Sequence, residues 1–205
     1  TLAALLFGSL STELIIYLVL IYVEMLTGYM DDAADEPWGE YKKGILDFIV
    51  AAIVALNYIH FNSTQIQIAT LGIDITLHPV VFFILTIILV WAAINVTNCS
   101  DGVDGLSGTL TIVTLVTIYV IDQVKGVSSD FAYVILLFVV CILGYLWYNA
   151  TPSRLMMGDA GSRAMGIFIS IAILKTGSPF LFLPAAAVLI VDEGLGLIKV
   201  ALLRF

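Results

Sequence analysis

The chain has 205 residues, of which 61% are hydrophobic and 12% are charged, and its formal net charge is −8. Its mean hydropathy is +1.09, whereas only about half of the residues of a soluble domain are apolar, so the composition excludes an ordinary soluble protein. We expect an all-α polytopic membrane protein whose partner is the lipid bilayer, with no nucleic acid bound. Its two cysteines have neither the number of a disulfide framework nor the spacing of a metal site.

Transmembrane helices are predicted wherever about 20 apolar residues follow one another, because such a run crosses the hydrocarbon layer. About seven runs qualify, and residues 1–10 predict the tail of a further, partial span. The seven cover residues 13–30, 45–61, 80–97, 105–121, 131–148, 161–174 and 180–203. The last helix is predicted to be broken, because Pro184 lies one turn in and residues 192–196 read Asp-Glu-Gly-Leu-Gly. We expect residues 1–205 to form a single transmembrane domain.

A small β-hairpin is predicted between the second and third spans. Residues 65–68 and 73–77 alternate polar and apolar side chains, with Gly72 between them. This alternation is the period of a β-strand. We expect the hairpin to lie outside the membrane.

Counting the crossings from residue 30 onward places three acidic motifs on the same membrane face. They are Asp31-Asp32, the loop with Asp101 and Asp104, and Gly158-Asp159-Ala160-Gly161-Ser162. Most basic residues fall on that face too: Lys42, Lys43, Arg154, Arg163, Lys199 and Arg204, against Lys125 and Lys175 on the other. The positive-inside rule then assigns this face to the cytoplasm.

The stretch from Asn95 to Leu106 is a polar island between two uncharged apolar runs. A segment that joins two spans lies at a membrane surface, because ionised groups are costly in hydrocarbon. Asp101 and Asp104, with nearby Asn and Ser side chains, offer hard oxygen ligands of the type that suits a magnesium-bound phosphate. A solvated loop with Asx-turns is the alternative.

The other polar motifs each have two interpretations. Asp31 and Asp32 close a helix, where the macrodipole disfavours anions, so they predict either a functional pair or a turn that caps the next segment. Asp159 lies just before an apolar helix, as an ordinary N-cap residue would, although the Gly-Ser start of that helix would also leave N–H groups for a phosphate. Asn149 is either a polar helix stop or a ligand contact. Glu24, inside a span, is either a functional or a packing residue.

Taken in order, four motifs resemble the polyprenyl-phosphate phospho-sugar transferases, and among them the phospho-N-acetylmuramoyl-pentapeptide transferases. The motifs are Asp31-Asp32, Asn95 and Asn98 with Ser100-Asp101-Gly102-Val103-Asp104-Gly105-Leu106, Asn149-Ala150-x-Pro152, and Met157-Gly158-Asp159-Ala160-Gly161-Ser162. The resemblance implies transfer of phospho-MurNAc-pentapeptide from its UDP carrier to undecaprenyl phosphate, with release of UMP, formation of lipid I for peptidoglycan, and a need for Mg²⁺. It also implies a ten-span fold in the bacterial inner (cytoplasmic) membrane, an active site that faces the cytoplasm, and a homodimer.

The resemblance also implies roles for single residues. Asp159 matches the family's magnesium-ligand aspartate, and Asp31 and Asp32 match its catalytic acidic pair, which handles the lipid phosphate. The implied substrate-binding residues are Asn95, Asn98, Asp101, Gly102, Val103, Asp104 and Asn149, with Asp104 near the uracil, together with Lys43 in place of an expected lysine and Met156 in place of a common aromatic residue. The family's early spans, its histidine-rich cytoplasmic loop and its final span are expected outside residues 1–205.

Three other functions fit part of the pattern. A related transferase would use UDP-N-acetylglucosamine. The CDP-alcohol phosphotransferases also carry Asp-Gly pairs, but their longer motif needs further acidic residues, and none follows Asp104 before Asp122. A cation-coupled transporter would hold its carboxylates at the midplane of broken helices, whereas these motifs lie at the ends of spans.

Overall fold

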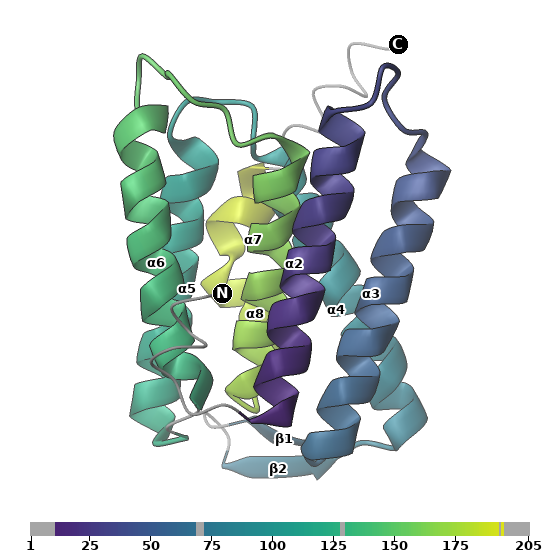
Figure 1. Cartoon of the computed structure of the whole chain (residues 1–205). Helices are drawn as coiled ribbons and strands as arrows, with labels where there is room; N and C mark the ends of the chain where they lie inside the picture. The colour runs from purple at the N-terminus through teal and green to yellow at the C-terminus, as the bar shows by residue number, and fades with distance from the viewer. Residues whose placement is uncertain (1–10, 69–71, 128–129, 193, 195–205) are drawn as a thin grey trace.

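The protein is a bundle of long helices with a two-stranded hairpin across one end (Figure 1). A computed structural model describes residues 11–68, 72–127, 130–192 and 194. The helices are α2 (Thr12–Asp32), α3 (Glu40–Phe61), α4 (Pro79–Cys99), α5 (Leu106–Lys125), α6 (Asp130–Asn149) and α7 (Gly158–Lys175), followed by the short η1 (Pro179–Leu181) and α8 (Phe182–Ala185), and the strands are β1 (Gln65–Ile68) and β2 (Ile73–Thr76). The predicted combination of a helical bundle and one small hairpin is confirmed.

Five of the described helices, α2 to α6, are long and apolar enough to cross a membrane. Large apolar side chains such as Ile49 of α3 and Ile88 of α4 are exposed on them. Exposed apolar surface of this extent is expected where lipid surrounds a protein. The chain is therefore a multi-pass membrane protein, while the ten-span count stays a prediction.

Helix α7 is the central helix of the bundle, and it differs from the other predicted spans. It packs along α2 and α4 (Figure 1), and every residue from 162 to 174 is buried. It also contains three charged residues, Asp159, Arg163 and Lys175. Because α7 is covered by the surrounding helices, its polar residues have protein partners rather than lipid around them.

The predicted break in the last helix is confirmed within the described residues. The segment begins as η1 and α8, and a turn at Ala186 separates α8 from helical residues 187–192. Pro184, which has no N–H to donate, lies inside α8. Residues 195–203 of this prediction, and the partial span predicted over residues 1–10, lie outside the described residues.

The hairpin closes the end of the bundle where α7 ends. Its register pairs Gln65 with Thr76, Ile66 with Ile75, Gln67 with Asp74 and Ile68 with Ile73. The Ile66 side chain is buried, and the Ser178 hydroxyl after α7 donates to the carbonyl oxygen of Gln67 at 2.6 Å. The backbone N–H of Gln67 also donates to the carbonyl oxygen of Gly177 at 3.1 Å. The buried Ile66 side chain and two hydrogen bonds thus attach β1 to the bundle.

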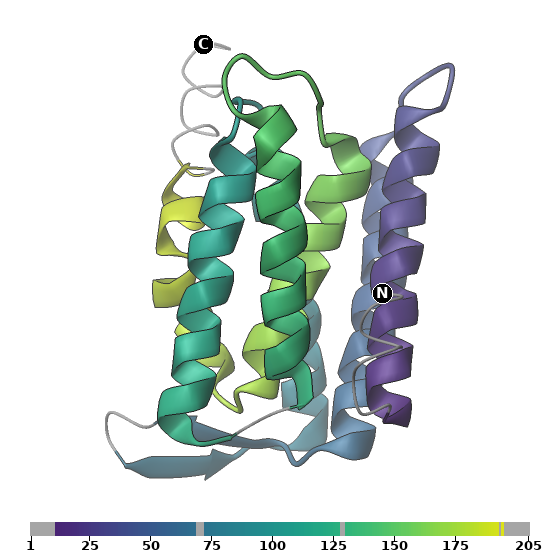
Figure 2. The same cartoon turned by 60° about the vertical axis from the view of Figure 1, so that its left-hand side comes forward.

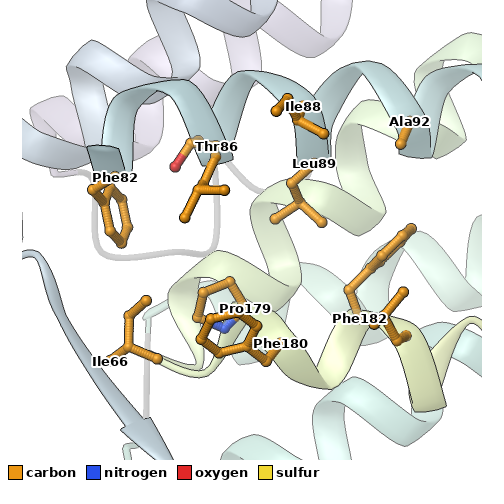
Figure 3. Close-up of a pocket in the computed structure, with 11 residues that line it drawn as sticks. Ile66, Phe82, Thr86, Ile88, Leu89, Ala92, Pro179, Phe180 and Phe182 are labelled. Atoms are coloured by element: carbon orange, nitrogen blue, oxygen red, sulfur yellow. The ribbon is translucent and has the colours of Figure 1, made fainter. Parts of the chain in front are cut away.

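An apolar groove of about 320 Å³ lies between α4 and the η1–α8 segment (Figure 3). Phe82 and Leu89 of α4 point toward Phe180 and Phe182 across it, and Thr86 supplies a hydroxyl group. Ile66 of the hairpin also lines this groove. The groove therefore belongs to the hairpin side of the molecule and not to the acidic end described next.

Candidate active site

The acidic motifs meet at the end of the bundle opposite the hairpin (Figures 1 and 2). Helix α2 ends there at Asp32, and α7 begins there at Gly158. The loops that join α2 to α3, α4 to α5, and α6 to α7 lie at the same end. The structure thus brings together the segments that the count of crossings placed on one face.

Lys43 lies at the centre of this end, in the first turn of α3. Its ammonium nitrogen is 2.5 Å from Asp31 Oδ2 and 3.2 Å from Asp159 Oδ2. The Asp31 side chain is buried, whereas a quarter of the Asp159 side chain, 25%, is exposed. One cation therefore joins two carboxylates that come from α2 and α7, and one of the two remains open to a ligand.

Asn98, at the end of α4, holds the other oxygen of Asp159. Its amide nitrogen donates to Asp159 Oδ1 and to Ser162 Oγ, each at 3.0 Å. The Ser162 hydroxyl in turn donates to the carbonyl oxygen of Gly158 at 3.0 Å. Both oxygens of Asp159 are thus oriented, one by α3 and one by α4.

Asp32 caps the N-terminus of α7. Its two carboxylate oxygens accept hydrogen bonds from the backbone N–H groups of Asp159 and Ala160, each at 3.3 Å. An anion is favourable at a helix N-terminus, which offsets the unfavourable place of Asp32 at the end of its own helix. Gly158 makes room for this contact, because its φ is +64° and a Cβ there would lie 2.4 Å from Asp32 Oδ2.

Two interpretations of the start of α7 are therefore wrong. Asp159 is not the N-cap: Met157 occupies that position without a side-chain capping bond, and Asp159 lies in the first turn. Its carboxylate bonds to Lys43 and Asn98 instead. The N–H groups that the Gly-Ser start was expected to leave for a phosphate are already bonded to Asp32.

Asp31 caps the next segment, as one interpretation predicts, and also contacts Lys43, while its catalytic role stays a prediction. Its Oδ1 accepts the backbone N–H of Trp38 at 2.7 Å, which ties down the loop between α2 and α3. Its Oδ2 pairs with Lys43. The same carboxylate therefore caps the next segment and holds the central cation.

Asp101 lies at the edge of the acidic cluster. Burial raises the pKa of its carboxyl group, and the neighbouring charges of Asp159 and Asp32 add to the rise. Hydrogen bonds from the Ser107 hydroxyl, at 3.0 Å, and from the backbone of Gly158 lower the pKa again. These interactions place the loop after α4 beside the first turn of α7.

Asp104 and Asn149 connect the α4–α5 and α6–α7 loops to each other. Asp104 Oδ2 accepts the backbone N–H of Ser153 at 3.0 Å. The buried Asn149 accepts the N–H of Gly105 at 2.8 Å and donates to the carbonyl oxygen of Leu155 at 2.9 Å. Asn149 therefore does more than stop a helix, since its amide holds two loops of the site in register.

The remaining predicted residues surround this centre. Gly102, Val103 and Met156 are exposed on the loops of the same end. Asn95 lines a pocket of about 180 Å³ that also includes Lys43. The structure thus places Asn95 next to the central cation and leaves the other three at the open surface.

Arg163 is the residue whose role the sequence reasoning missed. This buried cation of α7 contacts Glu24 of α2 and Asp47 of α3. Glu24, left open between function and packing, is therefore paired. The signal was present in the spacing, because Arg163 follows Asp159 by four residues and Asp47 follows Lys43 by four, which puts each pair on one helix face.

The oxygen donors of this end suit a magnesium ion shared with a phosphate. Proteins usually bind Mg²⁺ through one or two carboxylates, and waters and substrate phosphates supply the other ligands. Asp159 is partly exposed, as such a ligand must be. Among the residues that the structure describes, no group of three or more His, Cys, Asp or Glu side chains forms a cage of its own. The residues fit an ion held by Asp159 and a substrate, and they do not fit a site built by protein alone.

Comparison with known proteins identifies the family. Residues 14–177 match glycosyl transferase family 4. A phospho-N-acetylmuramoyl-pentapeptide-transferase of Treponema pallidum is 39% identical over 210 residues, which cover 92% of this chain and 57% of the relative. Proteins of the same name from Thermotoga neapolitana and Symbiobacterium thermophilum are 28% and 29% identical, over 93% and 90% of this chain and 63% and 58% of their own length. The chain thus spans less than two thirds of these curated relatives. Because the family match covers most of the chain, this protein belongs to glycosyl transferase family 4.

Proposed function

We propose that the protein of which this chain is part transfers phospho-MurNAc-pentapeptide from its UDP carrier to undecaprenyl phosphate, giving lipid I and UMP in peptidoglycan synthesis. The family and the names of the relatives support this activity. The observation that carries it is the position of Lys43 between Asp31 and Asp159 at one end of a membrane bundle. At an end of a membrane bundle, the phosphate of a lipid can meet the pyrophosphate of a soluble nucleotide.

The proposed chemistry is a phosphoryl transfer between two anions. An oxygen of the lipid phosphate attacks the phosphorus that bears the sugar, a new P–O bond forms, and UMP leaves with the electron pair of the broken bond. The lipid phosphate is mostly ionised at neutral pH, so the reaction needs no strong base. Positioning and charge neutralisation therefore account for most of the rate.

The residues of this end have distinct parts in the proposal. Lys43 supplies positive charge to the phosphates, Asp31 holds its ammonium group, and Asn98 orients Asp159. Asp32 fixes the first turn of α7, on which Asp159 stands. Magnesium bound by Asp159 and the substrate would neutralise the pyrophosphate and make UMP a better leaving group.

We propose that this end lies at the cytoplasmic face of a bacterial inner membrane, with the bilayer around helices α2 to α6. The excess of Lys and Arg residues on the segments of that face supports this orientation. A soluble nucleotide substrate reaches the site from the same side. The homodimer implied by the resemblance stays a prediction.

An assay of UMP release tests the proposal. The full-length protein, purified in detergent, should release UMP and form lipid I only when UDP-MurNAc-pentapeptide, undecaprenyl phosphate and MgCl₂ are all present. If UMP is released with UDP-N-acetylglucosamine as the substrate and not with UDP-MurNAc-pentapeptide, the protein is instead the related UDP-N-acetylglucosamine transferase. CMP release from a CDP-alcohol, or no nucleotide product at all, would refute the proposal.

The same protein tests the direct attack by the lipid. When it is incubated with the UDP substrate alone and quenched in acid, no phospho-MurNAc-pentapeptide should remain bound to the chain. Mass spectrometry that finds an aspartate carrying the phospho-sugar under these conditions would replace direct attack by a two-step route, in which UMP leaves before the lipid reacts.

A further inference from the structure

Arg163 of α7 lies between two buried carboxylates, Glu24 of α2 and Asp47 of α3. Its Nε donates to Glu24 Oε1 at 3.0 Å, its Nη2 lies 2.8 Å from the same oxygen, and Nη2 also bonds to Asp47 Oδ1. None of the three side chains is more than 5% exposed. We call these three residues the ion triad, which joins three helices inside the bundle.

The ion triad lies one helical turn beneath the candidate active site. Arg163 follows Asp159 by four residues, and Asp47 follows Lys43 by four. Each pair therefore lies on one face of its helix, separated by about one turn, roughly 5.4 Å along the axis. Both members of the Lys43–Asp159 ion pair thus have a residue of the triad directly below them.

Helix α3 packs on α4 and α2, but its backbone makes little direct contact with α7. Gly28 brings α2 against the backbone of α7, because a Cβ there would lie 2.5 Å from the carbonyl carbon of Asp159. Gly166 brings α7 equally close to α4, with Ile94 Cα 2.5 Å from the position of a Cβ. A Cβ on Gly44 of α3 would meet no atom within 4 Å, and a pocket of about 180 Å³ opens beside it. Ion pairs, rather than backbone contact, hold α3 to α7 at this level.

Stability alone is a weak reason for a buried ion triad. Charges moved from water into a protein interior carry a large desolvation cost, and apolar residues of similar volume often replace such triads without loss of stability. One guanidinium faces two carboxylates here, and Glu24 Oε2 has no hydrogen-bond partner among the described residues. The planar guanidinium of Arg163 does impose a geometry, because its N–H groups fix where the carboxylates of Glu24 and Asp47 lie around it.

We infer that Arg163 is a positioning residue for phosphoryl transfer. With Glu24 and Asp47 it sets where α3 stands relative to α7, and so holds the ammonium group of Lys43 at the carboxylate of Asp159. The inference rests on the proposed function, since the rate of UMP release is its readout. Reacting groups that are misplaced by about 1 Å lose roughly 100-fold in rate, even when the cause is distant.

Replacement of the whole triad gives the first test. In the full-length protein, the variant Glu24→Leu/Asp47→Leu/Arg163→Met should fold, because it leaves no buried charge unpaired. Its kcat for UMP release should fall by about 10- to 100-fold, with a smaller change in KM. The matched control is Glu13→Gln/Lys175→Met, which removes the 2.9 Å ion pair between α2 and α7 at the hairpin end. It should lower the melting temperature and keep kcat within about twofold of the unchanged protein.

Asp47→Asn gives a second test that does not require the triple variant to fold. It removes the charge of the ion pair to α3, which weakens this link, and leaves Arg163 paired with Glu24. Because Asp47 acts through Lys43, the loss of kcat caused by Asp47→Asn should largely disappear in a Lys43→Gln background. A folded triple variant with the original kcat, or an Asp47→Asn effect equal in both backgrounds, would overturn the inference. If the unchanged protein releases no UMP, the proposed function fails instead.

Discussion

The ammonium group of Lys43 lies 3.2 Å from the carboxylate of Asp159, although 116 positions separate the two residues in the chain. Asp31 contacts the same ammonium group at 2.5 Å. Three helices thus converge on one cation, at the place where the proposed reaction brings two phosphates together. Replacement of Lys43 is therefore the most direct test of the proposed site.

Lys43→Met should lower kcat/KM for UMP release by about 10²- to 10³-fold, the usual effect of removing a group that stabilises developing charge. Lys43→Arg should recover part of this loss, because the guanidinium keeps the charge in a different geometry. The control is Lys42→Met: the Lys42 ammonium lies over the Trp38 ring, 3.2 Å from its centroid, so its loss should change the rate by about twofold or less. Full activity of Lys43→Met would contradict the proposed role.

Gly158→Ala should destabilise the protein and slow the reaction. The positive φ of Gly158 carries a strain of about 1–2 kcal/mol for other residues, and the lost contact with Asp32 removes a helix cap worth about 0.5–2 kcal/mol. Thermal unfolding in detergent measures the loss of stability, and UMP release measures the loss of rate.

Gly126→Ala is the matched control for that glycine. Gly126 has a φ of +65°, and a Cβ there would meet no atom within 4 Å. Only the conformational strain of about 1–2 kcal/mol should apply, and the rate should not change. Equal losses of stability in the two variants would show that the Asp32 contact contributes nothing.

Asn98→Ala should weaken the binding of magnesium. Asn98 holds one oxygen of Asp159, and the loss of a group that orients a metal ligand typically costs about 10- to 100-fold in metal affinity or activity. The concentration of MgCl₂ that gives half of the maximal rate should therefore rise. EDTA should abolish UMP release and MgCl₂ should restore it.

Asn62→Ala is the control for this substitution, because Asn62 bonds to Glu13 and Lys175 at the hairpin end. Its magnesium titration should match that of the unchanged protein. A rate that persists in EDTA would remove magnesium from the proposal.

The contribution of Asp101 to the stability of the protein should fall as pH rises through its titration. Burial raises the folded-state pKa of this carboxyl group, so the folded protein binds the proton more tightly than the unfolded chain, in which the pKa is about 3.9. The part of the free energy of unfolding that comes from Asp101 should decrease from about pH 3.9 up to the raised pKa and stay lower above it.

Asp101→Asn cannot ionise and should lack this decrease. Its melting temperature should exceed that of the unchanged protein at pH 7, by a small amount because the side chain is partly exposed. The difference should close as the pH approaches the unfolded-state pKa, about 3.9. A difference that is independent of pH would contradict this account.

The architecture was predictable because hydrocarbon imposes strong rules on a sequence. An apolar run of about 20 residues is expected to cross the membrane. Counting these crossings was therefore enough to place Asp31, Asp101 and Asp159 at one end. The alternation around Gly72 was enough to predict the hairpin. Helix α7 was harder to interpret, because protein covers it and its charges have partners inside the bundle.

The contacts within the candidate site were not predictable in the same way. Asp159 resembles an N-cap residue locally, but the group that caps α7 is Asp32, 127 positions earlier in the chain. Likewise, Asp104 binds the backbone of Ser153 across 49 positions. Local propensity describes neighbours in sequence, and these pairings depend on how the helices pack.

The close approach at Gly28 has a consequence for how the site receives a ligand. Helices α2 and α7 touch backbone to backbone there, with Asp159 and Ala160 atoms at 2.5 to 2.6 Å from the position of a Cβ, so neither helix has slack to move toward the other. The carboxylates of Asp31, Asp32 and Asp159 therefore cannot be brought closer together by an approach of these two helices. Space for a bulky headgroup lies instead on the side of α3, where the pocket of about 180 Å³ opens beside Lys43.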